Sequence, residues 1–351
     1  MTEVHVIAPG GIDDPAHPTG GNTYDRRICD GLAATGWSVR LHAVPGAWPQ
    51  PDASACAALR RILESLPDRA LVLLDGLVAS TAPDVLVPQA GRLRLVALVH
   101  MPLGCGNPAE GVRARERAVL AAVASVITTS AWSRRTLLEL YGLAGDRVHI
   151  AEPGVDSAGL AAGTAEGGAL LCVAAVIPGK GHDVLVDALA TVAGAWRCVC
   201  VGSLERDPAF AERLRRSIRD RGLEERVRFA GPRTGADLAR SYREADVLVL
   251  ASRAETYGMV VTEALAAGLP VVATEVGGVP EALGRDARGV RPGLLVAPGD
   301  PAALGGALRA WLGSADLRRR LRDAARGRRP TLARWSATTS VVAAVLAEAA
   351  G

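Results

Sequence analysis

Lysine is nearly absent from this sequence. Lys180 is the only lysine, and arginine supplies all the other members of the 40 lysine and arginine residues. This composition, rich in alanine, arginine, glycine and valine, is typical of a GC-rich genome, in which solvent-exposed lysines tend to be replaced by arginine. A lysine that persists under this bias is a candidate for a role that the wider guanidinium group of arginine does not fill.

An excess of charge of either sign is also missing. The formal net charge is only +3, and residues 1–155 carry 14 arginines against 15 acidic residues. The sequence therefore lacks the basic surface that binding to nucleic acid or to anionic lipid requires. We expect neither class of partner.

The six cysteines follow no disulfide or zinc-binding pattern. They form no Cys-x-x-Cys pair and are not interleaved with histidines at the spacing of a metal site. Most lie in apolar segments, and Cys198 and Cys200 alternate on a predicted strand and should face the same side. We therefore expect buried free thiols, as in a reducing compartment, rather than disulfides or metal ligands.

Long apolar runs are missing too. No apolar segment reaches the ~18 residues that a transmembrane helix needs. The first residues, MTEVHVIAPGG, turn to glycine without the basic region and apolar run of a secretory signal. We expect no membrane span and a cytoplasmic location.

The sequence does contain a regular alternation of apolar runs and amphipathic stretches. The runs are nearly continuous in valine, isoleucine and leucine, which is typical of strands buried on both faces of a parallel sheet. The first half therefore predicts a doubly wound α/β unit. Its predicted strands are 4–9, 38–44, 70–76, 94–100, 125–130 and 147–153, and its predicted helices include 23–35, 55–66 and 131–142.

A second unit of the same kind follows a break at residues 152–168, which are rich in glycine and small residues, as in a linker. We expect two α/β domains, residues 1–155 and 156–330, whose strands end at a shared cleft, where ligands bind in open α/β folds. The helix-like tail, residues 331–351, is expected to pack back on the first domain. The predicted strands of the second domain are 169–176, 197–203, 226–231, 246–252, 270–276 and 293–299.

The strongest functional signal lies in residues 244–283. A buried strand ends at Ser252, a short loop holds Glu255, and a helix that begins near Gly258 carries Glu263. The free N–H groups at the start of this helix suit a phosphate or a sugar hydroxyl. In the alternative interpretation, Glu255 only complements the helix dipole and Glu263 is a solvated helix residue. The apolar context VVTEALAA argues against that alternative, because it predicts a costly buried carboxylate.

This segment resembles the retaining glycosyltransferases of the family-4 type, which have the GT-B fold of two Rossmann-like domains that face a cleft. Their motif of two glutamates with seven residues between them, followed by GGVPE, is present as Glu255, Glu263 and residues 277–281. The segment ALVHMPL resembles the one that supplies a histidine to the donor sugar, and IAEPGVD resembles the interdomain hinge. The amino-terminal glycine loop and first helix are matched by PTGGNTYDRRICDGLAATGWSV, so that the resemblance covers most of the chain.

The resemblance implies roles for the motif residues. Glu263 would bind the ribose hydroxyls of a sugar nucleotide, Glu255 would bind hydroxyls of the sugar, and Lys180 would stabilise the leaving diphosphate as a compact point charge. His100 would contact the sugar from the opposite domain. The alternatives are a surviving surface lysine and a structural histidine. The implied catalytic residues are Lys180, Glu255 and His100, and the implied donor-binding residues are Glu263, Thr256, Tyr257, Gly258, Met259, Val260, Gly20 and Gly21.

One position departs from the family pattern. Near relatives usually have an arginine five residues before the lysine, and this chain has Ala175 there. Stabilisation of the diphosphate would then rest on Lys180, the helix N-terminus and an arginine from elsewhere in the chain. Arg253 and Arg233 are the candidates for this second cation.

The resemblance implies transfer of a sugar from a nucleoside-diphosphate sugar to a hydroxyl or amine of a small soluble acceptor, with retention at the anomeric carbon, in natural-product or cell-envelope biosynthesis. Since no Asp-x-Asp motif stands where a sugar nucleotide would need a metal, we expect no metal and no other cofactor. Asp13, Asp14 and His17 are candidates for acceptor contacts, or are solvated loop residues. Two other functions stay open: a sugar-nucleotide epimerase, and a non-catalytic sugar-nucleotide-binding partner, which the alanine at position 175 suggests.

Overall fold

A computed structural model describes residues 2–351, and the contacts among these residues divide the chain into two compact units. The first unit comprises the residues up to Asp14, Thr19–Gly154 and Ala333–Gly351. The second comprises Pro15–Pro18 and Val155–Leu332. The chain thus enters the second unit at Val155 and leaves it after Leu332, and residues 15–18, which we expected in the first domain, pack with the second unit.

The first unit is built on a six-stranded parallel sheet with the strand order β2-β1-β3-β4-β5-β6. Its strands are β1 (Glu3–Pro9), β2 (Ser38–Val44), β3 (Leu71–Asp75), β4 (Arg94–Val99), β5 (Ser125–Thr128) and β6 (Val148–Ile150). Its helices are α1 (Gly20–Ala34), α2 (Ala53–Ser65), α3 (Gly76–Ala79), α4 (Pro83–Leu86), α5 (Val112–Ala122), α6 (Ala131–Tyr141) and α14 (Trp335–Ala350).

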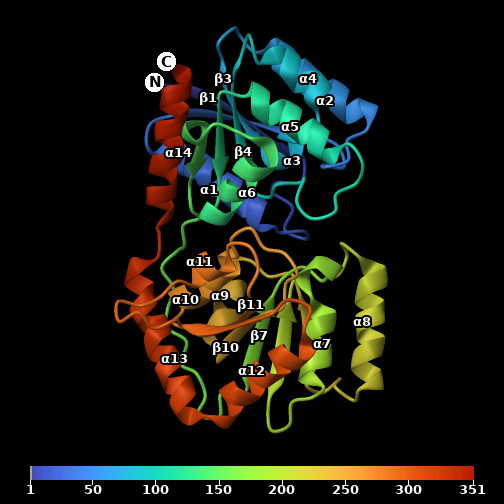
Figure 1. Cartoon of the computed structure of the whole chain (residues 1–351), viewed down its shortest axis with the longest axis vertical. Coiled ribbons are helices and arrows are strands. Elements are labelled where there is room, and N and C mark those ends of the chain that lie inside the picture. The colour runs from blue at the N-terminus through green and yellow to red at the C-terminus, as the bar shows by residue number, and fades with distance from the viewer. Residues whose placement is uncertain (1) are drawn as a thin grey trace. The chain divides into compact units, whose positions relative to one another are not determined.

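The C-terminal helix α14 packs against α1 on one face of this sheet, as Figure 1 shows. Trp335 of α14 meets the ring of Tyr24 edge-on, with 5.6 Å between the ring centroids. A Cβ atom at Gly31 of α1 would lie 2.2 Å from the hydroxyl oxygen of Thr339, so the two helices approach closely there. The other face of the sheet is covered by α2 to α6, whose apolar side chains form a separate core cluster.

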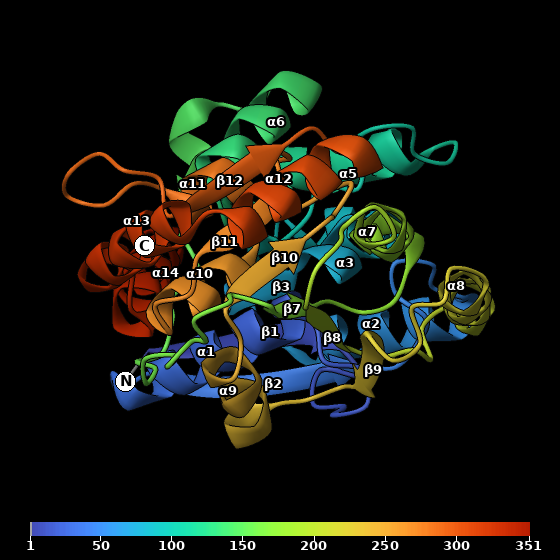
Figure 2. The ribbon, with the colours of Figure 1, turned by 90° about the horizontal axis from the view of Figure 1, so that it is seen from below.

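The second unit repeats the design with the strand order β12-β11-β10-β7-β8-β9, again all parallel. Helices α7, α8 and α12 cover one face, and α9, α10 and α11 cover the other, while α13 contributes apolar side chains to both cores (Figure 2). The strands are β7 (Ala169–Val173), β8 (Arg197–Val201), β9 (Val227–Gly231), β10 (Val247–Leu250), β11 (Val271–Thr274) and β12 (Gly293–Val296). The helices are α7 (His182–Leu189), α8 (Pro208–Asp220), α9 (Gly235–Arg243), α10 (Met259–Ala266), α11 (Val279–Leu283), α12 (Pro301–Gly313) and α13 (Ala315–Arg328).

Every strand that the apolar runs predicted is present, and the prediction of two parallel α/β sheets is confirmed. Two helices begin earlier than their apolar periodicity indicated, because side chains cap them. The hydroxyl oxygen of Thr19 accepts the N–H of Asn22 at 3.0 Å, and Asp52 accepts the N–H of Ala55 at 2.8 Å. Such caps satisfy N–H groups that have no partner within the helix, and they fix where α1 and α2 start.

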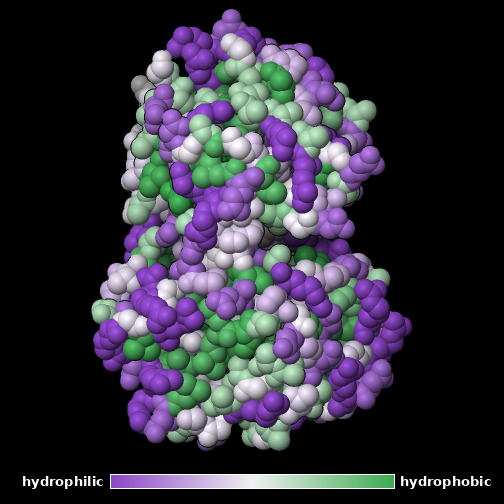
Figure 3. Space-filling model, viewed as in Figure 1, coloured by the Kyte–Doolittle hydropathy of each residue, from purple (hydrophilic) through white to green (hydrophobic). Residues whose placement is uncertain are grey.

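The surface mixes polar and apolar groups. On the face shown in Figure 3, small groups of green apolar residues lie between purple hydrophilic ones. Among residues 2–351, no helix combines the length and the apolar character needed to cross a bilayer.

Candidate functional site

The loops that follow β7 and β10 bring Lys180 and Glu255 together. These two strands are neighbours in the sheet, and parallel strands end at the same edge. Lys180 Nζ donates a hydrogen bond to Glu255 Oε1 at 2.6 Å, and the hydroxyl of Ser252 donates to the same oxygen at 2.8 Å. The side chains of Lys180 and Glu255 are 30% and 12% exposed, so that the two opposite charges form a partly exposed ion pair.

Lys180 lies in a tight 3-10 turn, Pro178–Lys180, whose end is fixed by Gly181. Gly181 has φ +67°, and a Cβ atom there would lie 2.0 Å from the carbonyl oxygen of Ala251. Gly179 has no atom within 4 Å of its Cβ position. Gly181 is required by a left-handed backbone and by the close approach of the chain at the end of β10.

Arg253 stabilises the same turn by hydrogen bonds. Its guanidinium donates to both carboxylate oxygens of Asp183, at 2.8 and 2.7 Å, and to the carbonyl oxygen of Pro178 at 2.6 Å. Its backbone N–H donates to the carbonyl oxygen of Gly179 at 2.9 Å. The hydrogen bond from Arg253 lowers the pKa of Asp183, and the hydrogen bond to Asp183 raises the pKa of Arg253. Arg253 is therefore engaged in holding the Lys180 turn.

Arg233, the other candidate for a second cation, donates one guanidinium N–H to the hydroxyl oxygen of Ser241 at 2.8 Å. The structure thus gives hydrogen-bond partners to both arginines, and the second cation in place of the family arginine at Ala175 stays a prediction.

Glu263 lies in α10 and has a buried partner. The hydroxyl of Tyr242, from α9, donates to Glu263 Oε2 at 2.6 Å, and Tyr242 is only 4% exposed. Burial raises the pKa of Glu263 and the charge of Asp156 adds to this, while the hydrogen bond from Tyr242 opposes it. Glu263 is thus half-buried and fixed in orientation, unlike a solvated helix residue.

No local sequence pattern indicates the role of Tyr242. A tyrosine on the apolar side of an amphipathic helix is typical of a core residue. Its hydroxyl needs a partner once it is buried, and that partner is 21 positions away in the chain.

The glycines of GGVPE support the loop that carries Glu255. A Cβ atom at Gly277, which has φ +52°, would lie 1.6 Å from the carbonyl oxygen of Glu255. At Gly278 it would lie 2.3 Å from the carbonyl oxygen of Thr256, and the N–H of Gly278 donates to the Glu255 carbonyl at 3.2 Å. Residues 256–260 accordingly run from this supported loop into the first turn of α10, which begins at Met259 after the left-handed Gly258.

In the first unit, His100 contacts two buried carboxylates. His100 Nε2 lies 2.6 Å from Asp25 Oδ1 and 3.6 Å from Asp75 Oδ2. Gly20 and Gly21 open α1, and a Cβ atom at Gly21 would lie 3.2 Å from His100 Cδ2. Gly20 and Gly21 are the donor-binding residues predicted in this unit. Of the two, Gly21 lies close to the ring of His100.

The electrostatics of this cluster are dominated by burial and by Asp25. Burial alone would lower the pKa of His100, but the charge and hydrogen bond of Asp25, together with the charge of Asp75, raise it. Burial and the charge of Asp25 raise the pKa of Asp75 to about 7. Sequence reasoning missed both aspartates, although one signal was present, since the apolar strand LVLLD ends in a charged residue.

The predicted acceptor-side residues do not form one cluster within either unit. Asp13 accepts a hydrogen bond from Arg26 Nε at 3.0 Å in the first unit. The N–H of Asp14 closes a turn onto the carbonyl oxygen of Gly11. His17 belongs to the second unit, where its Nε2 lies 3.7 Å from Glu205 Oε2.

All six cysteines are free thiols, and Cys56 and Cys105 are only half-buried. Cys172 and Cys200 lie close to His182 in the core of the second unit, which is a set of metal-binding residue types. The hydrogen bond with Cys200, and burial, raise the pKa of the Cys172 thiol well above its ordinary value. Metal independence stays a prediction.

Comparison with known proteins gives matches over both units. The profile of Glycosyltransferase Family 4 matches residues 2–158, and that of Glycosyl transferases group 1 matches residues 167–314. The D-inositol 3-phosphate glycosyltransferase of Jonesia denitrificans is 33% identical over 264 residues, which are 68% of this chain and 61% of that protein. The enzyme of that name from Kineococcus radiotolerans is 36% identical over 256 residues, or 66% of this chain and 58% of that protein. The chain therefore spans about three fifths of the length of these relatives.

Solved structures match over the whole chain. Sucrose-phosphate synthase from Thermosynechococcus elongatus superposes with a TM-score of 0.80 at 23% identity and covers 99% of both chains. Anabaena HepE in complex with UDP and glucose gives a TM-score of 0.78 at 19% identity and covers 99% of this chain and 100% of HepE. The fold is that of the GT-B glycosyltransferases. Together with the two matching profiles, this shows that the chain belongs to the family-4 glycosyltransferases, and the resemblance drawn from its motifs is confirmed.

Proposed function

We propose that this protein transfers a sugar from a nucleoside-diphosphate sugar to a hydroxyl or amine of a small acceptor. The observation that carries the proposal is the 2.6 Å hydrogen bond between Lys180 Nζ and Glu255 Oε1, which joins the family's phosphate-binding cation to its sugar-binding carboxylate. The donor class is supported by HepE, whose solved complexes contain UDP and UDP-glucose. The acceptor class is supported by relatives named for D-inositol 3-phosphate, a small molecule.

In this proposal the second unit binds the donor. Glu263, held by Tyr242, accepts hydrogen bonds from the two ribose hydroxyls, and Glu255 accepts them from hydroxyls of the sugar. Lys180 then exchanges part of its contact with Glu255 for the diphosphate. The N–H groups of the first turn of α10 add partial positive charge near the phosphates.

The chemical step requires little covalent participation by the protein. The bond from the anomeric carbon to the phosphate oxygen breaks, a bond to the acceptor oxygen or nitrogen forms on the same face, and the acceptor's proton goes to the departing phosphate. Catalysis then consists of positioning the two substrates and of stabilising the charge that grows on the diphosphate, which is the role of Lys180. We further propose that His100 contacts the sugar, and that the reaction takes place in the cytoplasm without a metal.

One observation favours a second candidate, a non-catalytic sugar-nucleotide-binding partner. Ala175 replaces the second family cation, and Arg253, which could have compensated, is bound to Asp183. Such a protein would keep Glu263 and Glu255 for binding but would stabilise the leaving group less well.

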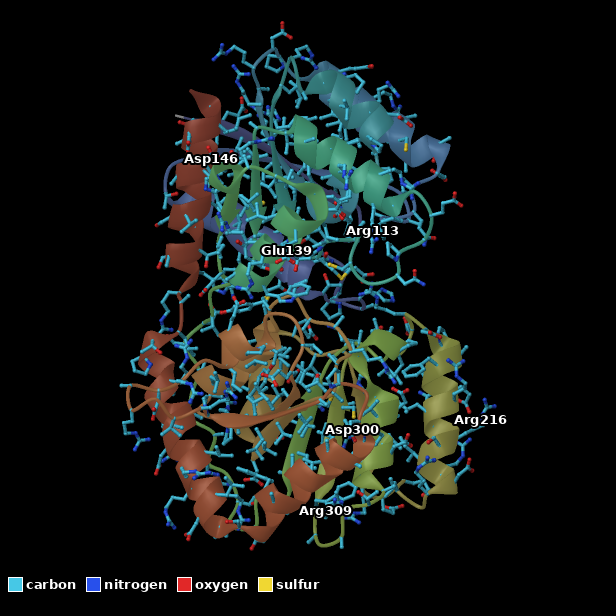
Figure 4. The ribbon with its side chains drawn as sticks, in the orientation of Figure 1. Arg113, Glu139, Asp146, Arg216, Asp300 and Arg309 are labelled. Carbon is cyan, nitrogen blue, oxygen red and sulfur yellow. The ribbon has the colours of Figure 1, made fainter. Side chains whose placement is uncertain are left out.

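Mass spectrometry of the protein mixed with a panel of uridine, guanosine, adenosine and thymidine diphosphate sugars, with and without inositol phosphates and other small polyols, tests the proposal. A mass increase of the acceptor by one sugar supports it. Conversion of the donor to an isomer without acceptor indicates an epimerase, and binding without turnover indicates the non-catalytic partner; either result contradicts it. Arg216→Ala, at an exposed residue that projects from α8 in Figure 4, is the control variant.

A further inference from the structure

We propose that Asp25 and Asp75 are positioning residues that hold His100 as a cation, so that its Nδ1–H is a fixed hydrogen-bond donor to a substrate oxygen. Only the identity of that substrate rests on the proposed function. The cluster itself is contained in the first unit and can be tested without turnover.

The geometry assigns one nitrogen of His100 to the protein. Nε2 lies 2.6 Å from Asp25 Oδ1, a distance typical of a charge-assisted hydrogen bond, and 3.6 Å from Asp75 Oδ2. Both carboxylates are buried, at 3% and 5% exposure. The other oxygen of Asp75 accepts the N–H of Leu77 at 2.7 Å, which fixes this carboxylate. Because an ionised carboxylate accepts and does not donate, we assign a proton to Nε2.

The other nitrogen, Nδ1, is left for a ligand. No hydrogen-bond partner of Nδ1 exists among residues 2–351, and Nδ1 is not one of their buried unpaired polar atoms. The side chain is 17% exposed. The ring orientation is fixed by Tyr24, which meets it edge-on at 5.1 Å between centroids, and by the close approach of Gly21. A donor that is both exposed and oriented is what recognition of a substrate oxygen requires.

The charge balance favours the imidazolium. Asp25 and Asp75 are the ionisable groups that determine the pKa of His100, and the neighbouring Tyr24 hydroxyl stays neutral because burial raises its pKa. Two buried carboxylates side by side cannot both ionise without a cation between them. Since the pKa of His100 is raised, the charged form is present below that pKa and is lost above it. The Nδ1–H donor therefore disappears as the pH rises, and Nδ1 becomes an acceptor.

The direct test is an NMR titration of the histidine Cε1–H signals, with His100 assigned by its loss in His100→Gln. We expect His100 to titrate above the ordinary value of about 6.5. In Asp25→Asn its pKa should fall by at least one unit, and in Asp75→Asn by less. The matched control is Asp146→Asn, at an exposed aspartate of the same unit that is labelled in Figure 4, and it should leave the pKa unchanged.

A His100 that titrates at or below 6.5 in the wild-type protein would overturn the proposal, whether or not the variants fold. So would a pKa that does not move in folded Asp25→Asn. In either case His100 would be a neutral imidazole whose Nδ1 accepts hydrogen bonds.

Kinetics separate this inference from the proposed function. If the protein transfers sugar, Asp25→Asn should lower kcat/KM about tenfold at a pH above the pKa values of His100 measured in both proteins, and much less at a pH below both, where the imidazole is protonated in each. A purely structural role of Asp25 would lower activity equally at both pH values, which would contradict the proposal. A raised, Asp25-dependent pKa in a protein without transferase activity would leave the cluster established and the proposed function refuted.

Discussion

Lys180 and the hydroxyl group of Ser252 donate hydrogen bonds to the same carboxylate oxygen of Glu255. Glu255 Oε1 accepts from both the ammonium group and Ser252, so that the cation lies beside the glutamate that we propose to bind the sugar. An ammonium group is compact and can turn toward a phosphate, whereas the planar guanidinium of arginine needs a wider site. In the proposed function, this difference explains a lysine at this position in a chain that otherwise uses arginine.

Lys180→Ala should reduce kcat by about 10²–10³-fold, as expected for loss of a group that stabilises charge in the transition state. Lys180→Arg should restore part of this loss. The stability of Lys180→Ala should change by only about 1 kcal/mol or less, because a partly exposed ion pair contributes little and Ser252 still binds Glu255. Steady-state kinetics and thermal unfolding measure the two effects, with Arg216→Ala as control. Wild-type kcat in Lys180→Ala would show that the lysine is a bystander.

At the residue scale, the motif positions were predictable and their partners were not. Glu255, Glu263 and Lys180 could be identified from spacing and resemblance. Glu116 could not be identified in this way, since the charged segment RARERAVLAA is typical of a solvated helix face. The structure buries Glu116 completely, where it accepts from the hydroxyls of Ser80 and Tyr141 and from the N–H groups of Leu103 and Gly104. These partners are distant in sequence, so no local pattern reveals them.

The turn between β7 and α7 is joined to the loop after β10 by hydrogen bonds and by a close approach of the two backbones. Arg253 holds its carbonyl oxygens, and Gly181 lies against the backbone of Ala251. Periodicity predicted the strand before this turn, because the strand is long enough to show an apolar pattern. The turn geometry depends on contacts across the sheet edge, which a single sequence does not show.

Gly181→Ala should destabilise the protein by at least about 1 kcal/mol, because alanine is strained at positive φ and its Cβ would collide with the Ala251 carbonyl. The matched variant Gly179→Ala should unfold like the wild type, since its Cβ meets no atom within 4 Å. Chemical denaturation of the two variants measures the difference. Equal stability would mean that the turn is not as closely packed as described.

At the scale of the whole molecule, Asp246 fixes the segment that leads into the second unit. It is fully buried and accepts hydrogen bonds from the N–H and hydroxyl of Thr164, from the N–H of Ala169 and from Arg322 of α13. Thr164 of the glycine-rich linker at residues 152–168 is therefore attached to Asp246, which directly precedes β10, and to Arg322 of α13. The composition of the linker predicted a break between units but not this attachment.

Asp246→Ala should lower the free energy of unfolding by about 3 kcal/mol or more, because it leaves a largely buried arginine and several N–H groups without their acceptor. Asp316→Ala, which removes an exposed aspartate paired with Arg319 on the same helix as Arg322, should cost less than about 1 kcal/mol. Urea titrations followed by circular dichroism compare them. A small effect of Asp246→Ala would show that the linker is held by other contacts.

The two-sheet plan of the molecule follows from the alternation of apolar runs with amphipathic helices, and the tail helix could be recognised from its apolar character. The assignment of residues 15–18 to the second unit could not be predicted, because PAHP is too short to carry a periodic pattern. The Tyr242–Glu263 hydrogen bond escaped prediction because it joins two helices across one face of the sheet.

Calorimetric titration of sugar nucleotides into the wild-type protein and Glu263→Gln tests most directly the claim that the second unit is built to bind a nucleoside-diphosphate sugar. The wild-type protein should bind a member of the panel, and Glu263→Gln should bind it about 1–3 kcal/mol more weakly while remaining folded, since a charged hydrogen-bond acceptor is replaced by a neutral one. Glu225→Gln, at an exposed glutamate of the same unit, should bind like the wild type. An unchanged affinity in Glu263→Gln, or no binding of any sugar nucleotide by the wild-type protein, would contradict this account.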